Sequence, residues 1–85
     1  MSIQIRGRFW KEGRYWKAEI PEFDILVKAP DPEQTLQKLS EKIDAYSEGM
    51  DYEINTNGLQ DGPLYFETDN WRQAVLLIIK RRILS

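Results

Sequence analysis

The chain has 85 residues, enough for one domain near the lower size limit for folding without disulfides or metals. It contains neither cysteine nor histidine, which excludes disulfides, thiol nucleophiles and thiolate or imidazole metal ligands, and removes the usual general base near neutral pH. Its net charge of −2 gives no overall attraction to nucleic acid or acidic lipid, and no apolar run reaches the ~20 residues of a membrane span. We therefore expect one domain over residues 1–85 that is cytoplasmic, has no membrane segment, needs no cofactor or metal and is not an enzyme.

Three strands are predicted at the start of the chain. Residues 3–10 and 14–20 each alternate between an apolar and a polar face, as half-buried strands do. The connection 11–13 ends in glycine, which is typical of a three-residue hairpin loop with a type I turn and a left-handed last residue. Residues 25–28 are apolar and β-branched, which predicts a third short strand and a small meander.

A helix is predicted over residues 32–49. Asp31 is a favoured N-cap residue, and Pro32 suits the first helical position. Apolar side chains then recur at spacings of three and four, at Leu36, Leu39, Ile43 and Tyr46. This pattern indicates an amphipathic helix that packs one face on the sheet.

Two further strands and a last helix complete the predicted fold. Residues 52–54 and 64–67 resemble strands joined by turn-forming residues, and residues 68–70 offer caps for a helix over 71–83. The predicted class is α+β, with the order β-β-β-α-β-β-α, a small sheet and an amphipathic helix on one face. The ten aromatic residues predict an aromatic-rich core.

The segment 15–23, followed by a capped amphipathic helix, resembles the N-terminal domain of HicB-type antitoxins. Residues 6–9 and the basic end of the last helix also look like a subgroup of these proteins, whereas residues 24–26 and 30–32 depart from the family pattern. The resemblance implies a partial RNase H-like fold and a non-catalytic protein that neutralises a small HicA-like RNA-cleaving toxin or acts as a stand-alone regulator. In that subgroup the last helix leads into a DNA-binding segment, which we expect this chain to lack because it stops at Ser85.

Carboxylates are grouped in sequence around the end of the second predicted strand. RNase H enzymes use converging carboxylates to hold two metal ions, the first of them usually on the opening strand. Residues 3–10 contain no acidic residue, and a strand end, a turn and a helix cap account for Glu19, Glu22, Asp24 and Asp31. We therefore expect no catalytic and no metal-binding residues.

The outward side of the first hairpin combines positive charge with aromatic surface. Its side chains are Arg6, Arg8, Trp10, Tyr15 and Lys17. Such a face can anchor a protein partner, or it can stack bases and pair phosphates as a nucleic-acid-binding module. The third interpretation is an ordinary surface on which Trp10 packs against arginine stems and Glu19 pairs with a neighbour.

The last predicted helix is apolar on more than one side. Its candidate oligomer interface consists of Trp71, Val75, Ile78, Ile79 and Ile83. Self-association as a two-fold homodimer would cover this surface, and the alternative is that all of it packs into the core without a partner. The basic residues 80–82 complement the negative end of the helix dipole, or form a second binding cluster.

Overall fold

The computed structural model describes residues 2–47 and 49–84, and for residues 80–84 the backbone alone. Its elements in chain order are β1 (Ile3–Glu12), β2 (Tyr15–Ile20), the 3₁₀ helix η1 (Pro21–Phe23), β3 (Ile25–Ala29), α1 (Pro32–Tyr46), β4 (Glu53–Thr56), β5 (Gly62–Thr68) and α2 (Trp71–Leu84). This order confirms the predicted α+β class and the β-β-β-α-β-β-α sequence. Within the described ranges, no helix is both long and apolar enough to cross a bilayer.

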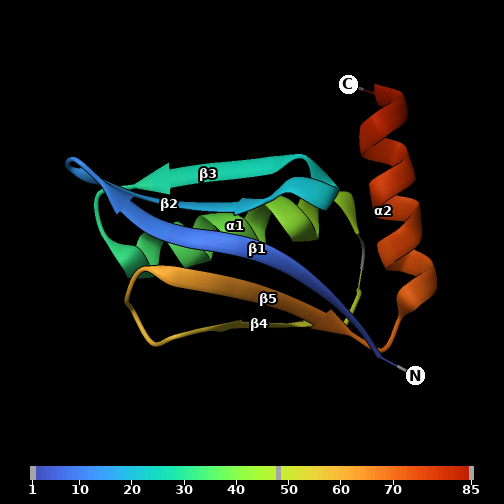
Figure 1. The fold of residues 1–85 in the computed structure, drawn as a ribbon. Coiled ribbons are helices and arrows are strands. Elements are labelled where there is room, and N and C mark those ends of the chain that lie inside the picture. Colours follow the sequence, from blue (N-terminus) through green and yellow to red (C-terminus); the bar gives the residue numbers. More distant parts are fainter. Residues whose placement is uncertain (1, 48, 85) are drawn as a thin grey trace.

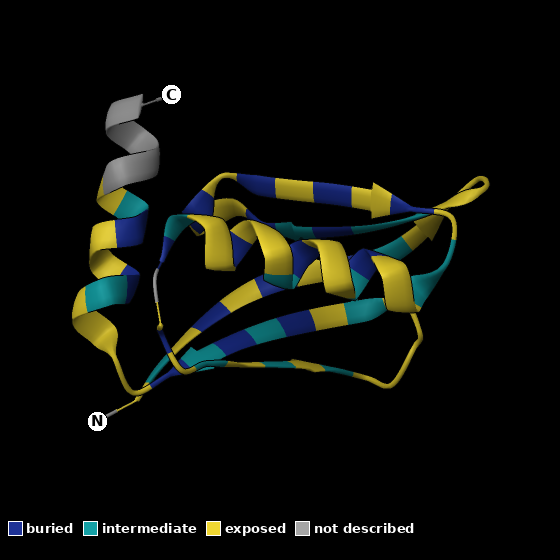
Figure 2. Cartoon of the chain, turned by 180° about the vertical axis from the view of Figure 1, so that it is seen from behind, coloured by how far each residue is buried: buried dark blue, intermediate teal, exposed yellow. Residues whose placement is uncertain are grey.

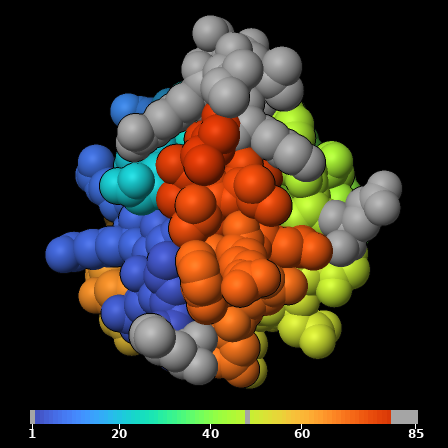
Figure 3. Space-filling view, turned by 90° about the vertical axis from the view of Figure 1, so that its right-hand side faces the viewer, coloured from blue at the N-terminus to red at the C-terminus, as the bar shows by residue number. Residues whose placement is uncertain are grey.

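The strands form one sheet in the order β3-β2-β1-β5-β4, and all neighbouring strands are antiparallel. Helix α1 covers one face of this sheet, and α2 stands across one end of it (Figure 1). Figure 3 views the molecule from that end, where α2 lies over the body of the domain beside the start of β1. The result is a sheet with one covered face and one open face.

Strand β1 is central because its alternating pattern is long enough to serve two neighbours. It pairs with β2 through Arg8–Glu12 and with β5 through Ile3–Phe9. Ile5 and Phe9 are buried beneath it, as the alternation predicts. Gly7 lies between them, and a Cβ there would come within 2.3 Å of the Glu19 carbonyl oxygen. A side chain at position 7 would therefore clash with the backbone of β2.

The first hairpin turn differs from the prediction. Residues 11 and 12 continue β1, and Lys11 and Glu12 pair with Trp16 and Tyr15, so the loop has two residues rather than three. Gly13 has a φ of 63° at the first loop position, which is where a type II′ turn needs glycine. The sequence identified the glycine correctly but assigned it to the wrong turn.

Helix α1 begins as predicted and ends earlier than expected. Asp31 Oδ1 accepts a hydrogen bond of 2.8 Å from the Gln34 backbone N–H, which confirms the cap. The helix ends at Tyr46 instead of residue 49, because Ser47 adopts an extended conformation while its N–H and hydroxyl both donate to the Ile43 carbonyl. Strand β4 begins at Glu53, one residue after the predicted start.

Buried residues lie on the face of the sheet that α1 covers (Figure 2), and the buried cluster is mostly aliphatic, with Phe9, Phe23 and Phe66 as its aromatic members. Phe23 and Phe66 meet edge to face with 4.9 Å between ring centroids, and Tyr52 stacks on Phe66 at 5.3 Å. The sequence pattern missed Thr35, which is fully buried because its hydroxyl donates to the Asp31 carbonyl one helical turn earlier. In the described part of the chain, every buried side-chain nitrogen or oxygen has a hydrogen-bond partner. The covered face is thus fully satisfied internally.

Candidate partner-binding face

The sheet face opposite α1, here called the open face, carries the outward side chains of all five strands. They are Gln4, Arg6, Arg8, Trp10 and Glu12 of β1, Tyr15, Lys17 and Glu19 of β2, Leu26 and Lys28 of β3, Glu53 and Asn55 of β4, and Pro63, Tyr65 and Glu67 of β5. Figure 1 views this face directly, with β1 in front and α1 behind the sheet. Polar and charged groups can occupy it because water solvates them on this side.

All five residues of the predicted binding patch lie on the open face. The register places Trp10 opposite Lys17, and Tyr15 opposite Glu12 at the hairpin end. Arg8 lies two residues before Trp10 on β1 and is opposite Glu19. The predicted grouping is therefore present in the fold, whatever its function.

Two cations on this face lie over aromatic rings. The guanidinium carbon of Arg8 is 4.6 Å from the centroid of the Trp10 ring, and Lys28 Nζ is 5.0 Å from the centroid of the Tyr15 ring. Such contacts stabilise an exposed pair by about 0.5–1 kcal/mol. They also hold the two rings and their cations in defined positions. Each pair offers a flat apolar surface with positive charge on top of it.

Lys28 was not part of the sequence-based prediction. It belongs to β3, and pairing across β2 places it opposite Lys17. Its position follows from the register of two hairpins, and the second of these includes a 3₁₀ turn that the sequence pattern did not reveal.

Lys17 is already engaged with another side chain. Its ammonium forms an ion pair with Glu12, and this hydrogen bond, together with the positive charge of Lys17, lowers the pKa of the Glu12 carboxyl. The Lys17 side chain is 28% exposed. Because this ion pair occupies the Lys17 ammonium, a partner would contact Arg6, Arg8 and Trp10 more readily than Lys17.

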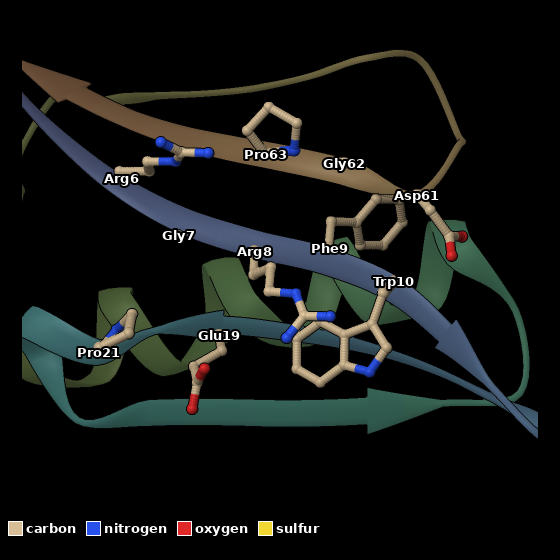
Figure 4. A pocket seen from close by; sticks show the side chains of 10 residues that line it. All are labelled: Arg6, Gly7, Arg8, Phe9, Trp10, Glu19, Pro21, Asp61, Gly62 and Pro63. Carbon is tan, nitrogen blue, oxygen red and sulfur yellow. The ribbon is translucent and has the colours of Figure 1, made fainter.

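A shallow hollow of about 600 Å³ lies on the open face around β1 (Figure 4). Arg8 turns over the Trp10 indole on the β2 side of the strand, while Arg6 extends on the β5 side toward Pro63. Glu19 and Asp61 add carboxylates to its rim, and Asp61 Oδ1 accepts a hydrogen bond of 3.2 Å from the Lys11 backbone N–H. The hollow thus combines two guanidinium groups, an indole and two acids.

The carboxylates considered at the end of β2 occupy separate structural positions. Asp31 caps α1, and Asp24 has a left-handed conformation, with φ of 55°, at the end of η1. Glu19 is on the open face, and Glu22 lies within η1. Over residues 2–47 and 49–84, no group of three or more acidic side chains is arranged to hold a metal ion.

The candidate interface on α2 is only partly as expected. Trp71, Val75 and Ile79 follow one another at four-residue spacing and are 48%, 37% and 45% exposed. Ile78 instead packs partly against the core, and the side chain of Ile83 lies outside the described residues, as do those of residues 80–82. The interface was predicted without Leu76, which is 52% exposed.

The apolar run of α2 does not indicate which side of the helix faces the core. For this reason the sequence did not distinguish Ile78, which packs against the core, from Leu76, which is exposed. Six consecutive apolar residues, 74–79, fit any rotation of the helix. The structure sets the rotation by burying Ala74 and Leu77 against the core. Among the α2 side chains that the structure describes, the exposed apolar ones are Trp71, Val75, Leu76 and Ile79, here called the α2 stripe.

Comparison of the chain with protein-family models, with curated proteins and with solved structures finds no match.

Proposed function

We propose that this chain is a non-catalytic, HicB-like binding protein with a partial RNase H-like fold, and that its open face covers a small HicA-like RNA-cleaving toxin. The observation that carries the proposal is the contrast between the two sheet faces. Helix α1 covers one face, whereas Arg8, Trp10 and Tyr15 are held in place on the other, where folding does not require those residue types. Arginine, tryptophan and tyrosine are the residues that most often anchor protein interfaces.

The composition of the open face favours a protein partner over a nucleic acid. Glu19 and Asp61 border the hollow beside Arg6 and Arg8, and carboxylates at these positions repel phosphate groups. Lys17 is paired with Glu12, so its charge is already compensated. A protein surface can match this mixture of charges, since interfaces carry both signs around an aromatic anchor.

The proposal predicts a short reading frame for a small, basic HicA-like protein next to this chain in its native genome, and co-expression of the two tests it. The wild-type chain should restore growth to cells expressing that toxin and should purify with it. A variant carrying Arg8→Ala and Trp10→Ala should fold, fail to restore growth and lose the complex, while Gln37→Ala on the exposed side of α1 should behave as wild type. Neutralisation that survives the double substitution would contradict the role of the open face.

The competing function gives a different result in a second assay. A nucleic-acid-binding module would retain a single-stranded oligonucleotide with an affinity that falls steeply with salt, and would lose it in the same double variant. Such binding, without any effect on the toxin, would replace the antitoxin proposal.

We also propose that the α2 stripe packs against the same stripe of a second copy. Trp71, Val75 and Ile79 form one continuous line on the helix, and a single line of this kind can pair with itself about a two-fold axis. Sedimentation should therefore show a dimer that Val75→Glu converts to a monomer, with Gln37→Glu on the exposed side of α1 as the charge-matched control. A wild-type monomer at high micromolar concentration would contradict the dimer.

A further inference from the structure

Strand β3 forms an edge of the sheet whose exposed backbone groups can be identified. In an antiparallel pair, the N–H and C=O of one residue point to the same side of the strand, and the sides alternate along it. The two-residue hairpin makes Glu12 and Tyr15 its closing hydrogen-bonded pair, so the alternation directs the backbone of Ala18 toward β3. Its partner Val27 therefore bonds back to β2, and the backbone groups of Leu26 and Lys28 point away from the sheet.

A hydrogen bond confirms this orientation independently. Lys38 Nζ, on α1, donates to the Lys28 carbonyl oxygen at 3.2 Å, which is possible only if that carbonyl points away from β2. A lysine at a strand edge is one way in which proteins limit uncontrolled strand pairing. Here the lysine covers a single carbonyl. The N–H and C=O of Leu26 and the N–H of Lys28 remain directed toward the open edge.

A groove accompanies this edge on the covered side of the sheet. It has a volume of about 310 Å³ and lies between β3 and α1, lined by Val27, Lys38, Glu41, Lys42 and Ala45. Val27 and Ala45 provide apolar contacts in it. On the other side of the edge, Leu26 is 56% exposed. Alternate side chains of an added strand would therefore meet the groove on one side and Leu26 and Lys28 on the other.

The charges around this edge select the occupant. Lys38 and Lys42 line the groove with Glu41 as its one acid, and on the other face Lys28 follows Leu26, which lies opposite Glu19, so lysines outnumber acids around the edge. Pairing the β3 edges of two copies would bring these lysines together, which opposes a symmetric dimer at this site. The opposite edge of the sheet has the reverse character, because Glu53 of β4 lies opposite Glu67 of β5. An acidic strand is thus attracted to the β3 edge and repelled from the β4 edge.

We propose that the β3 edge is a second docking site, which accepts an extended segment of a partner protein with alternating apolar and acidic side chains as a sixth strand. Backbone hydrogen bonds to Leu26 and Lys28 would fix the register, as in other complexes formed by strand addition. The apolar side chains of the segment enter the groove and contact Val27 and Ala45, and its acidic side chains lie on the other face of the sheet, beside Lys28. Lys38 leaves the Lys28 carbonyl, which then accepts a hydrogen bond from the segment, and the charges of Lys38 and Lys42 attract the acidic segment through space. This site does not involve Arg8 or Trp10 and does not require the partner to be a toxin.

Amide hydrogen exchange, followed residue by residue by NMR, tests the proposal with a defined probe. In the free protein the amides of Leu26 and Lys28 should exchange fast while that of Val27 is protected. A short, end-capped peptide of alternating valine and glutamate should slow exchange at Leu26 and Lys28, and higher salt should weaken the effect. The same peptide with lysine in place of glutamate is the matched control and should have no effect.

Two changes locate the contact without relying on one variant. Leu26→Pro removes an edge N–H at a position where an edge strand tolerates proline, and should weaken peptide binding at least about tenfold. N-methylation of every second peptide residue, with the protein unchanged, should abolish binding in one of the two registers and leave it in the other. Arg8→Ala with Trp10→Ala should leave peptide binding unchanged, so that failure of the open-face proposal does not affect this test.

Three outcomes would overturn the proposal. The first is the absence of slowed exchange at Leu26 and Lys28 at millimolar peptide. The second is slowed exchange at these amides in the free protein that grows with protein concentration, which would assign the edge to a second copy. The third is a peptide effect centred on the open face around Trp10.

Discussion

The two faces of one sheet are built from alternate residues of the same strands, yet different requirements determine them. On the covered face Ile5, Phe9 and Phe66 are almost completely buried and touch other core residues. On the open face Arg8 and Trp10 contact each other in solvent. Folding requires the covered-face side chains to be apolar and well packed. It requires only that the open-face side chains be compatible with water. Residue types that exceed this requirement support the binding function proposed for the open face.

The largest effect is expected from emptying the covered face. Phe66→Ala removes a ring that is fully buried between Phe23 and Tyr52 and should lower the free energy of unfolding by about 3–5 kcal/mol. Tyr65→Ala changes the preceding residue of β5, whose side chain lies on the open face, and should lower the free energy of unfolding by about 1 kcal/mol or less. Chemical denaturation of both variants measures the difference. Equal losses would contradict the division between the faces.

Overfilling the covered face is the second test. Gly7→Ala would place a Cβ 2.3 Å from the Glu19 carbonyl oxygen, and separating β1 from β2 should cost about 2–3 kcal/mol. Gly62→Ala is the matched control on β5, because its Cβ would meet only Asn57 Cβ, at an ordinary 3.9 Å. Thermal melting should separate the two variants clearly. A Gly7→Ala protein as stable as Gly62→Ala would show that the strands can move apart freely.

The rim of the covered face should respond to high pH. Burial, and next a hydrogen bond to the Asp44 carboxylate, raise the pKa of Tyr52 to about 12, above its usual value of 10.0. Folding therefore favours the neutral phenol, and the stabilisation is complete below pH 10 and lost as the pH rises toward 12. Wild type should lose more stability than Tyr52→Phe over this interval in parallel denaturant titrations. Identical pH profiles would mean that the phenol is not held in its neutral form.

The open face should give the smallest change in stability. Arg8→Ala and Trp10→Ala remove a solvent-exposed cation–aromatic pair, so the free energy of unfolding should fall by about 1 kcal/mol or less. Denaturation of the double variant checks this value. A loss as large as that of Phe66→Ala would make the pair part of the fold and remove the main argument for a binding function.

Alternation and capping made much of this structure predictable from sequence. Period-two patterning placed both faces of β1 correctly, and the Asp31 cap fixed the start of α1. The hairpin loop was wrong by one residue, because local glycine chemistry is compatible with two turns and long-range pairing of Lys11 and Glu12 decides between them. The rotation of α2 was ambiguous for a related reason, since a uniformly apolar run carries no phase until Ala74 and Leu77 meet the core.

The binding patch was predictable only in part. Its β1 and β2 members share a hairpin, so counting along the chain placed them together. Lys28 depends on how β3 pairs with β2, and the hydrogen bond from Lys38 to the β3 edge depends on how α1 lies across the sheet. Neither contact has a local sequence signal. Features that join separate elements are therefore the ones that required the structure.

Site-specific photo-crosslinking in the native host is the most direct test of the central claim, which is that the open face is where the chain touches its partner. A benzophenone amino acid replaces Tyr15 in one protein and Gln37, on the opposite layer, in another. We expect one discrete adduct from the Tyr15 position, absent from the Gln37 position and lost when Arg8→Ala and Trp10→Ala are added. Adducts only from Gln37, or the same adducts from both positions, would contradict it.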